Sequence, residues 1–289
     1  MKIKILIPVY NDFQSASKLI VDINSVISNL NEEFSIIIIN DASTEKAEIN
    51  VSNIDKIKSV KIINMKENQG HARCIASGMK YIFDNDEFDY LIPMDGDGED
   101  RAEEISKFIE FLNYDKSKPI VGERVKRSEG LIFKLCYKFH KIITYVFTGQ
   151  SIKFGNYTCL PRSTVEKMIN EKATWSSFSG SLSKLEKNRS TIPSIRGERY
   201  FGPSKMSFYN LIKHSLSIIA VFKINVIIRS ILFYLIYLLL ISENITYITS
   251  IPLILVVIFV ISVLGISKRE NLDQLNNSLL NISNIDNLK

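Results

Sequence analysis

The sequence predicts an α/β protein with an open, mostly parallel sheet, followed by a C-terminal transmembrane helical hairpin. Short apolar strands alternate with amphipathic helices through residues 3–112, the pattern of an open α/β sheet. Two long apolar segments lie between residues 224 and 266. A chain of 289 residues has room for one globular domain of about 200 residues in addition to such a hairpin.

Four strands are expected in the first part of the chain, at residues 3–7, 36–39, 60–63 and 90–94. The second is four consecutive isoleucines, apolar on both faces as a central parallel strand should be. Ligands in open α/β sheets bind beyond the carboxyl ends of the strands. The polar residues expected at those ends are Tyr10, Asp41, Gly70 and Asp95.

Asp95 and Asp97 form the most informative pair. They follow an apolar strand and lie in a loop that contains Gly96 and Gly98. Two carboxylates so placed can hold a hard divalent cation against a diphosphate. An acidic, glycine-containing loop on its own is more often a solvated turn, so the neighbouring motifs decide between the two interpretations.

Those neighbours make the resemblance specific. The four ordered motifs resemble those of family 2 glycosyltransferases with a GT-A fold, and the match in order and spacing covers roughly residues 1–210. The motifs are Ile7-Pro8-Val9-Tyr10-Asn11-Asp12, Asn40-Asp41-Ala42-Ser43-Thr44, Asn68-Gln69-Gly70-His71 and Met94-Asp95-Gly96-Asp97. The second motif usually begins with two acids in this family, and here Asn40 replaces the first, which concerns base preference more than activity.

The resemblance implies a site for a UDP- or GDP-sugar donor. Asp41 would contact the base or ribose, and Asp95 and Asp97 would hold Mg²⁺ or Mn²⁺ and the sugar diphosphate. The implied donor-binding residues are Pro8, Val9, Tyr10, Asp12, Asp41, Gly70, His71 and Asp95, and the implied catalytic residues are Asp95, Asp97 and Arg124. His71 begins a helix, where a structural histidine is the alternative to a diphosphate contact.

Two apolar segments, 224–241 and 245–266, are expected to form the hairpin. The first is interrupted by Asn225, Arg229 and Ser230, so an interfacial or buried helix is its alternative. Arg229 near one end can snorkel to the headgroups, which is compatible with a span. The expected parts are a GT-A catalytic domain at 1–206, an amphipathic interfacial helix at 207–222, the hairpin at 223–267 and a polar tail or frayed helix at 268–289.

Charges beside the hairpin predict its orientation. Lys223, Lys268 and Arg269 flank the apolar segments and place both ends of the hairpin in the cytoplasm. Met1-Lys2 opens directly into a strand with no signal peptide pattern, so the catalytic domain and both termini are expected to be cytoplasmic, at the inner cell membrane. The three cysteines show no paired spacing, which argues against zinc and a disulfide framework.

The net charge of +5 is modest, but cations gather between Lys116 and Lys141. This stretch also has an apolar face, so a surface for anionic lipid or an anionic acceptor competes with a solvated helix face. It resembles the region that holds the lipid phosphate in polyprenyl-phosphate glycosyltransferases. The acceptor residues so implied are Arg124, Arg127 and Lys138, with Lys134 as an alternative to Lys138. Nucleic acid is not expected, since aromatic and basic residues do not interleave.

A lipid phosphate is already an anion near neutral pH and needs positioning rather than a general base. The expected reaction is therefore inverting transfer of a sugar from a nucleoside diphosphate to polyprenyl phosphate, within cell-envelope glycan synthesis. Should a base be needed, Glu99 and Asp100 are the nearest acids. The alternatives are extension of a saccharide or lipid-linked glycan, nucleotidyl transfer and a non-catalytic membrane partner. Homo-oligomer formation is left open.

Overall fold

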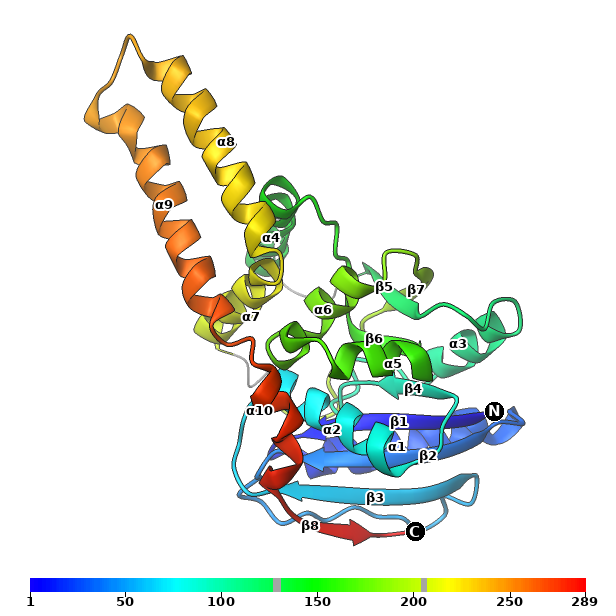
Figure 1. Ribbon diagram of the computed structural model, residues 1–289. Coiled ribbons are helices and arrows are strands. Elements are labelled where there is room, and N and C mark those ends of the chain that lie inside the picture. Colours follow the sequence, from blue (N-terminus) through cyan, green and yellow to red (C-terminus); the bar gives the residue numbers. More distant parts are fainter. Residues whose placement is uncertain (127–130, 204–206) are drawn as a thin grey trace.

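The computed structural model of the protein describes residues 1–126, 131–203 and 207–289, with the backbone alone at 126 and 131–137. The described residues form one eight-stranded mixed sheet in the order β7-β5-β6-β4-β1-β2-β3-β8 (Figure 1). Its strands are β1 Lys2–Val9, β2 Glu33–Asn40, β3 Ile57–Met65, β4 Tyr90–Pro93, β5 Ile120–Lys126, β6 Phe154–Pro161, β7 Ser190–Ile195 and β8 Ile282–Asn287.

The four predicted strands are the parallel centre of this sheet. β1 pairs in parallel with β2 and β4, and β2 pairs in parallel with β3. The register aligns Val9 with Asn40 and Asn40 with Asn64, so the polar residues that follow these strands meet at one edge. The prediction of an open, mostly parallel α/β sheet of GT-A type is confirmed.

Helices cover both faces of the sheet. They are α1 Phe13–Val26, α2 His71–Asn85, α3 Glu104–Leu112, α4 Leu131–Thr148, α5 Arg162–Ile169, α6 Phe178–Leu185, α7 Phe208–Ala220, α8 Lys223–Ile241, α9 Tyr247–Ser267 and α10 Leu272–Asn276. Short 3₁₀ turns lie at Ile27–Asn29, Lys172–Trp175 and Ser278–Asn281. α1 and α3 pack on one face, against residues such as Ile5 and Ile36, and α2, α5 and α6 pack on the other, against Leu6 and Ile37. Alternate residues of each central strand thus supply two cores.

The segment after α9 differs from the expected polar tail or frayed helix. It forms α10, a 3₁₀ turn and β8, and β8 pairs antiparallel with β3 as an edge strand of the sheet. Asn64 on β3 donates a 2.7 Å hydrogen bond to Asp286 on β8. The sequence pattern concealed this strand because an exposed edge strand carries polar residues on most positions.

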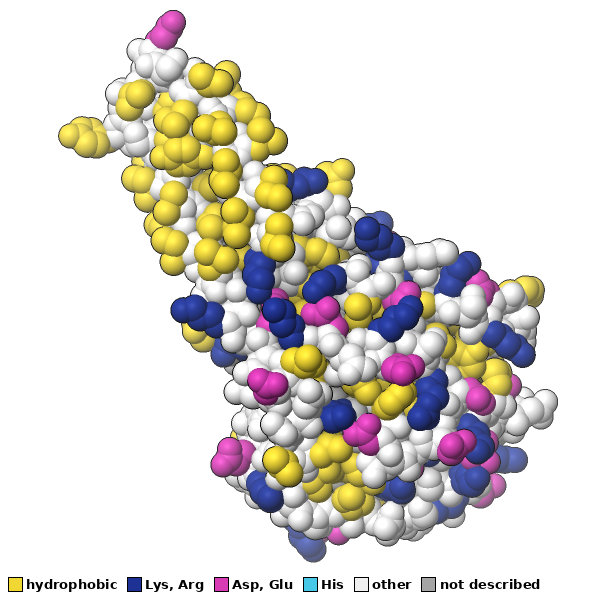
Figure 2. Space-filling model, in the orientation of Figure 1, with side chains coloured by type: hydrophobic (Ala, Val, Ile, Leu, Met, Phe, Trp, Pro, Cys, Tyr) yellow, Lys and Arg dark blue, Asp and Glu magenta, His cyan; other side chains and the backbone are white. Residues whose placement is uncertain are grey.

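α8 and α9 form two antiparallel helices that project from the globular part (Figure 1). Both are long and apolar enough to cross a membrane, with mean hydropathies of 2.3 and 2.7. At 1.5 Å per residue, 19 and 21 residues span about 28 and 32 Å, close to the hydrocarbon thickness of a bilayer. Most of their apolar side chains are exposed, and the projecting part of Figure 2 is mainly yellow. Leaving such side chains in water costs about 1.5–3 kcal/mol each, so lipid is the environment that this surface fits.

Two polar interruptions of α8 are exposed and also contact α4. Asn225 donates a 3.0 Å hydrogen bond to the carbonyl of Thr148, and Arg229 donates a 2.9 Å hydrogen bond to the carbonyl of Val146. These carbonyls belong to the last turn of α4, where a cation also meets the negative end of the helix dipole. Arg229 therefore caps α4, and its access to the lipid headgroups stays a prediction.

Candidate active site

The predicted site residues gather where the central strands end. His71 begins α2, Asp95 and Asp97 follow β4, Arg124 lies on β5 and Asn156 lies on β6. The parallel register brings the ends of β1, β2 and β4 to one edge, and the antiparallel neighbours β5 and β6 add Arg124 and Asn156 there.

Asp95 lies at the centre of this arrangement. Its Oδ1 accepts a 3.4 Å hydrogen bond from Asn156 Nδ2 and lies 3.4 Å from His71 Nε2. Asn156 Nδ2 is in turn 2.6 Å from His71 Nε2. Burial acts to raise the pKa of Asp95, but the charges of His71, Arg124 and Arg196 and the Asn156 bond outweigh it and hold that pKa below its usual value. Asp95 is therefore ionised in a strongly cationic setting.

Asp97 is held by a second arginine. Arg199 forms ion pairs with both Asp97 and Asp12, the latter at 2.7 Å. The Asp97 carboxylate also accepts a 3.0 Å hydrogen bond from the backbone N–H of Glu99. Burial and the charge of Asp95 raise the pKa of Asp97 to about 6. The two predicted donor-side acids, Asp12 and Asp97, thus share one guanidinium group.

The segment 196–200 lies directly on the acid loop. Backbone hydrogen bonds of 2.8 and 2.9 Å join Gly197 to Glu99 and Tyr200 to Asp97. Gly98 has φ +90°, and a Cβ on it would lie 2.7 Å from the ring of Tyr200. Any side chain at residue 98 would collide with that ring, so glycine here permits the close approach of the two segments.

The two acids considered as general bases have other partners. Glu99 forms an ion pair with Arg196. Asp100 is buried, and its carboxyl accepts a 2.9 Å hydrogen bond from the backbone N–H of Asp95. Burial and the charge of Asp95 raise the pKa of Asp100 to about 8. Neither acid presents a free carboxylate to an acceptor.

Asp41 is almost fully buried and acts on a neighbouring loop. Its two carboxylate oxygens accept 2.9 Å hydrogen bonds from the backbone N–H groups of Gln69 and Gly70. Asn68 Nδ2 donates a 3.0 Å bond to the Asp41 carbonyl. Burial raises the pKa of Asp41, against the effect of these bonds. Asp41 therefore fixes the turn that leads into α2, and contact with a nucleotide stays a prediction.

The end of β1 adds the predicted residues Pro8, Val9 and Tyr10 to this edge of the sheet. Val9 is buried, Pro8 is half-buried and Tyr10 is 45% exposed. Asn11 has φ +52°, and its backbone N–H donates a 2.9 Å hydrogen bond to Ser43 Oγ, while its Oδ1 accepts a 2.8 Å bond from the backbone N–H of Thr44. These bonds fasten the end of β1 to the end of β2 and leave the Tyr10 ring open to a planar ligand.

Among the described side chains predicted to hold an acceptor phosphate, Arg124 lies near Asp95. Its guanidinium lies over Gly155, where a Cβ would be 2.8 Å from Nη2. Its positive charge acts on both Asp95 and Asp100. Lys138 is exposed on α4, whereas Arg127 and the side chain of Lys134 lie outside the described residues.

Histidines from α4 and α7 also approach this edge. Burial together with the charges of His71, His140 and Arg124 lowers the pKa of His214 to about 4. The side chain of His214 is reached by solvent. The edge of the sheet that holds Asp95 therefore lies near α7, which packs together with α4 against the base of α8 and α9.

Several of these residues escaped sequence reasoning. Arg199, Tyr200 and Asn156 lie outside the four sequence motifs, so the sequence alone did not assign them to this site. His214 gave no signal. The motif Met94–Asp97 contains two acids and no cation. This imbalance is the signal from which a neutralising arginine elsewhere in the chain could have been expected.

The donor set of Asp95 and Asp97 fits a hard divalent cation. Carboxylate oxygens are the ligands that Mg²⁺ and Mn²⁺ prefer, and a cation would relieve the repulsion that raises the pKa of Asp97. Within the described ranges no group of three His, Cys, Asp or Glu side chains is arranged to hold a metal. A cation here would therefore take its other ligands from phosphate oxygens and water, as Mg²⁺ does at nucleotide sites.

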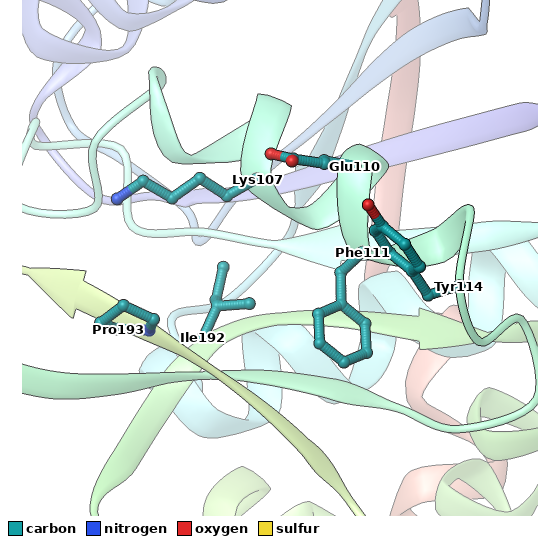
Figure 3. A pocket seen from close by; sticks show the side chains of 6 residues that line it. All are labelled: Lys107, Glu110, Phe111, Tyr114, Ile192 and Pro193. Atoms are coloured by element: carbon teal, nitrogen blue, oxygen red, sulfur yellow. The ribbon is translucent and has the colours of Figure 1, made fainter.

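Two shallow hollows lie away from this edge. One, of about 230 Å³, opens between α3 and β7, where Phe111 and Tyr114 face Ile192 and Pro193 (Figure 3). The other, of about 470 Å³, lies beside Met1, Tyr90 and Pro161. Neither contains a predicted site residue, and we assign no ligand to them.

The fold and the arrangement of its sheet define a protein of the GT-A class. The sequence profile of glycosyl transferase family 2 matches residues 4–175. The chain therefore belongs to that family.

Curated relatives include the undecaprenyl-phosphate 4-deoxy-4-formamido-L-arabinose transferases of Salmonella choleraesuis and Salmonella paratyphi B. Each is 29% identical over 218 residues, which cover 73% of this chain. The match spans 64% of the length of these relatives.

Solved structures share the fold. Glucosyl-3-phosphoglycerate synthase from Mycobacterium tuberculosis, in complex with Mn²⁺, UDP-glucose and phosphoglyceric acid, has a TM-score of 0.54 at 10% identity, covering 78% of this chain and 79% of that one. A mannosyltransferase from Pyrobaculum calidifontis, in complex with GDP-Man and Mn²⁺, has a TM-score of 0.50 at 11% identity, covering 96% and 74%.

Proposed function

We propose that this protein is a membrane-anchored, inverting glycosyltransferase that moves a sugar from a UDP- or GDP-sugar to polyprenyl phosphate. One observation carries the proposal. Asp95, Arg124 and His71 lie within electrostatic reach of His214 on α7, a helix that packs against the base of the apolar hairpin. The reactive edge therefore opens toward the region where a lipid acceptor would lie.

The donor side is supported by the family motifs and by their geometry. The end of β1, with Tyr10 exposed, offers a surface for a base, and the turn held by Asp41 leads into the start of α2. The backbone N–H groups at the start of a helix favour a phosphate. Arg199 and Arg196 supply further positive charge beside the acid loop. A nucleoside diphosphate matches this combination of an open ring surface and cationic groups.

The acceptor side favours a phosphate over a hydroxyl. Glu99 is paired and Asp100 is buried, so the acid loop offers no free general base, which a sugar hydroxyl usually needs. A phosphate monoester is already anionic and needs a cation to place it. The charge of Arg124 acts on Asp95, and its planar guanidinium suits bidentate phosphate binding.

In this mechanism the chain positions two phosphate-bearing reactants on opposite sides of the anomeric carbon. Arg124 orients an acceptor phosphate oxygen for attack, while the bond from the anomeric carbon to the donor diphosphate breaks on the opposite face, which inverts the configuration. Asp95 and Asp97 would hold Mg²⁺ or Mn²⁺, which when bound supplies positive charge to the leaving diphosphate. Arg199 and Arg196 lie where they can add to that stabilisation.

The hairpin sets where the reaction occurs. Lys223, Lys268 and Arg269 lie at its base, beside the globular part, and the excess of cations favours the cytoplasmic side of the inner membrane. The globular domain and both termini would then be cytoplasmic, with the reactive edge held at the membrane surface. Relatives named as undecaprenyl-phosphate transferases support the same acceptor class.

The test is a transfer assay with the purified full-length chain. A panel of radiolabelled UDP- and GDP-sugars is incubated with undecaprenyl phosphate, with a soluble saccharide and without acceptor, in Mg²⁺ or Mn²⁺. We expect label in the lipid fraction with undecaprenyl phosphate only. Transfer to the saccharide but not to the lipid phosphate would replace this proposal with the hydroxyl-acceptor alternative.

A further inference from the structure

A pair of arginines at the base of the hairpin lies outside the site described above. Arg73 belongs to the first turn of α2, and Arg269 follows the last turn of α9. The side chains of both are half-buried. Burial and the charge of Arg269 lower the pKa of Arg73, so the two guanidinium groups lie near one another.

Arg73 is held in place by an aromatic ring and has spare hydrogen-bonding capacity. Its Cζ lies 5.2 Å from the ring centroid of Trp175, a distance at which the cation and the ring attract. The ring is fixed because Trp175 is buried and its Nε1–H donates a 2.8 Å hydrogen bond to Gln274 of α10. Arg73 Nε is buried with no hydrogen-bond partner among the described residues.

No carboxylate within the described residues pairs with either arginine. Glu270, next to Arg269 in the sequence, forms an ion pair with Lys223 at 3.0 Å. Burial and the charge of Arg269 both lower the pKa of Arg73, and no anion among the described residues raises it. A buried donor without a partner costs roughly 1–3 kcal/mol, and an anion bound between the two guanidinium groups would remove that cost.

The position of the pair indicates the depth of the ligand in the membrane. α9 ends at Ser267, and Lys268 and Arg269 follow at once, at the level where the apolar surface stops. Figure 2 shows Lys and Arg side chains gathered on the visible face where the yellow hairpin meets the globular part. Lipid phosphates lie at this level of a bilayer. Arginine binds phosphate oxygens with two parallel hydrogen bonds, which lysine cannot do.

We propose that Arg73 and Arg269 form a phosphate-binding site, backed by Trp175, that takes the headgroup phosphate of an anionic membrane lipid. The site goes beyond the proposed transfer reaction, because it requires no donor or acceptor. A bound lipid would join α2, whose first residue is His71, to the end of α9 and so fix the hairpin against the catalytic domain.

The test measures thermal unfolding of the full chain in a neutral detergent, titrated with dioctanoyl phosphatidylglycerol, dioctanoyl phosphatidylcholine or inorganic phosphate. Ligands that bind the folded state raise the melting temperature. Arg73→Gln and Arg269→Gln each remove one guanidinium group, and Lys268→Gln is the matched control because it removes a neighbouring charge outside the pair. The readout is independent of transfer activity, so it can fail while the proposed function stands.

We expect phosphatidylglycerol to raise the melting temperature of the wild-type chain and of Lys268→Gln. In Arg73→Gln and Arg269→Gln the apparent affinity should fall at least about tenfold, as expected for the loss of a charge-assisted hydrogen bond. An equal effect of inorganic phosphate would support the site and assign it to a soluble anion. Equal phosphatidylglycerol affinity in the folded arginine variants and in Lys268→Gln, or no shift in any chain, would overturn it. If one arginine variant does not fold, the other decides.

Discussion

The acid loop after β4 and the base of the hairpin differ in how their charges are balanced. In the acid loop, Arg199 bridges Asp97 and Asp12, and Arg196 pairs with Glu99. At the base of the hairpin, Arg73 and Arg269 have no such partner among the described residues. A ligand that binds at the acid loop must break ion pairs that already exist. An anion that binds between Arg73 and Arg269 breaks no ion pair among the described residues.

The largest effect is expected when an acid of the acid loop is replaced. Asp97→Asn and Asp95→Asn should each lower turnover at least about a hundredfold, the loss typical of a deleted electrostatic stabiliser. The measurement is sugar transfer at saturating Mg²⁺ or Mn²⁺ and matched expression. Asp84→Asn is the control, because Asp84 is an exposed acid on α2 that forms an ion pair with Lys80 one turn earlier. Normal turnover in both variants would exclude a catalytic role for the acid pair.

The next test separates the donor and acceptor sides. Arg124→Ala should raise the acceptor KM or lower kcat by about tenfold or more, because a charge-assisted phosphate contact is lost. Donor affinity, measured by calorimetry with UDP and GDP, should stay within about twofold of the wild type. Lys118→Ala, in the same basic stretch but paired with Asp115, serves as the control. Unchanged acceptor kinetics in Arg124→Ala would argue for a hydroxyl acceptor bound elsewhere.

A smaller effect is expected at Asp41, whose partners are backbone N–H groups. Asp41→Ala should weaken nucleoside diphosphate binding by about 1–3 kcal/mol, because Gln69 and Gly70 lose their acceptor and the turn before α2 loosens. Asp41→Asn, which keeps one acceptor oxygen, should lose less. Calorimetry in the absence of acceptor measures both. Equal affinities for the three chains would leave Asp41 a role in folding alone.

The smallest effect is expected at Arg229, whose charge is balanced by the carbonyl end of α4 instead of a carboxylate. Arg229→Gln should lower the stability of the chain in detergent by about 0.5–1.5 kcal/mol, because the last carbonyls of α4 lose a cationic donor. Thermal melting measures this, with Glu243→Gln at the tip of the hairpin as the control for charge removal. An unchanged melting temperature in Arg229→Gln would show that water replaces the cap.

Sequence periodicity was enough to predict the central strands and the edge at which they end. Ile36–Ile39 is apolar on both faces, and only a buried parallel strand tolerates such a run. The acid pair followed from its place after β4. These features depend on local pattern, so they can be read without knowing which distant segments meet.

The features that could not be predicted depend on contacts between distant segments. Arg199 lies more than a hundred positions from Asp97 in the sequence, and only folding brings them together. Asn156 reaches the site because β6 pairs with β4, which brings its side chain into contact with His71. The contact of Arg229 with the last turn of α4 could not be predicted, because a sequence does not show that the end of α4 lies beside it.

The pairing of β8 with β3 changes how the order of synthesis relates to folding. The hairpin is an insertion within the sheet domain, since strands of one sheet lie on both sides of it along the chain. A ribosome therefore releases both apolar helices before it releases β8, and the edge of the sheet at β3 stays open until then. Such a pairing over more than two hundred residues forms late and slowly. Membrane insertion would thus come before completion of the catalytic domain, and any fault in insertion would leave β3 exposed to pairing with another chain.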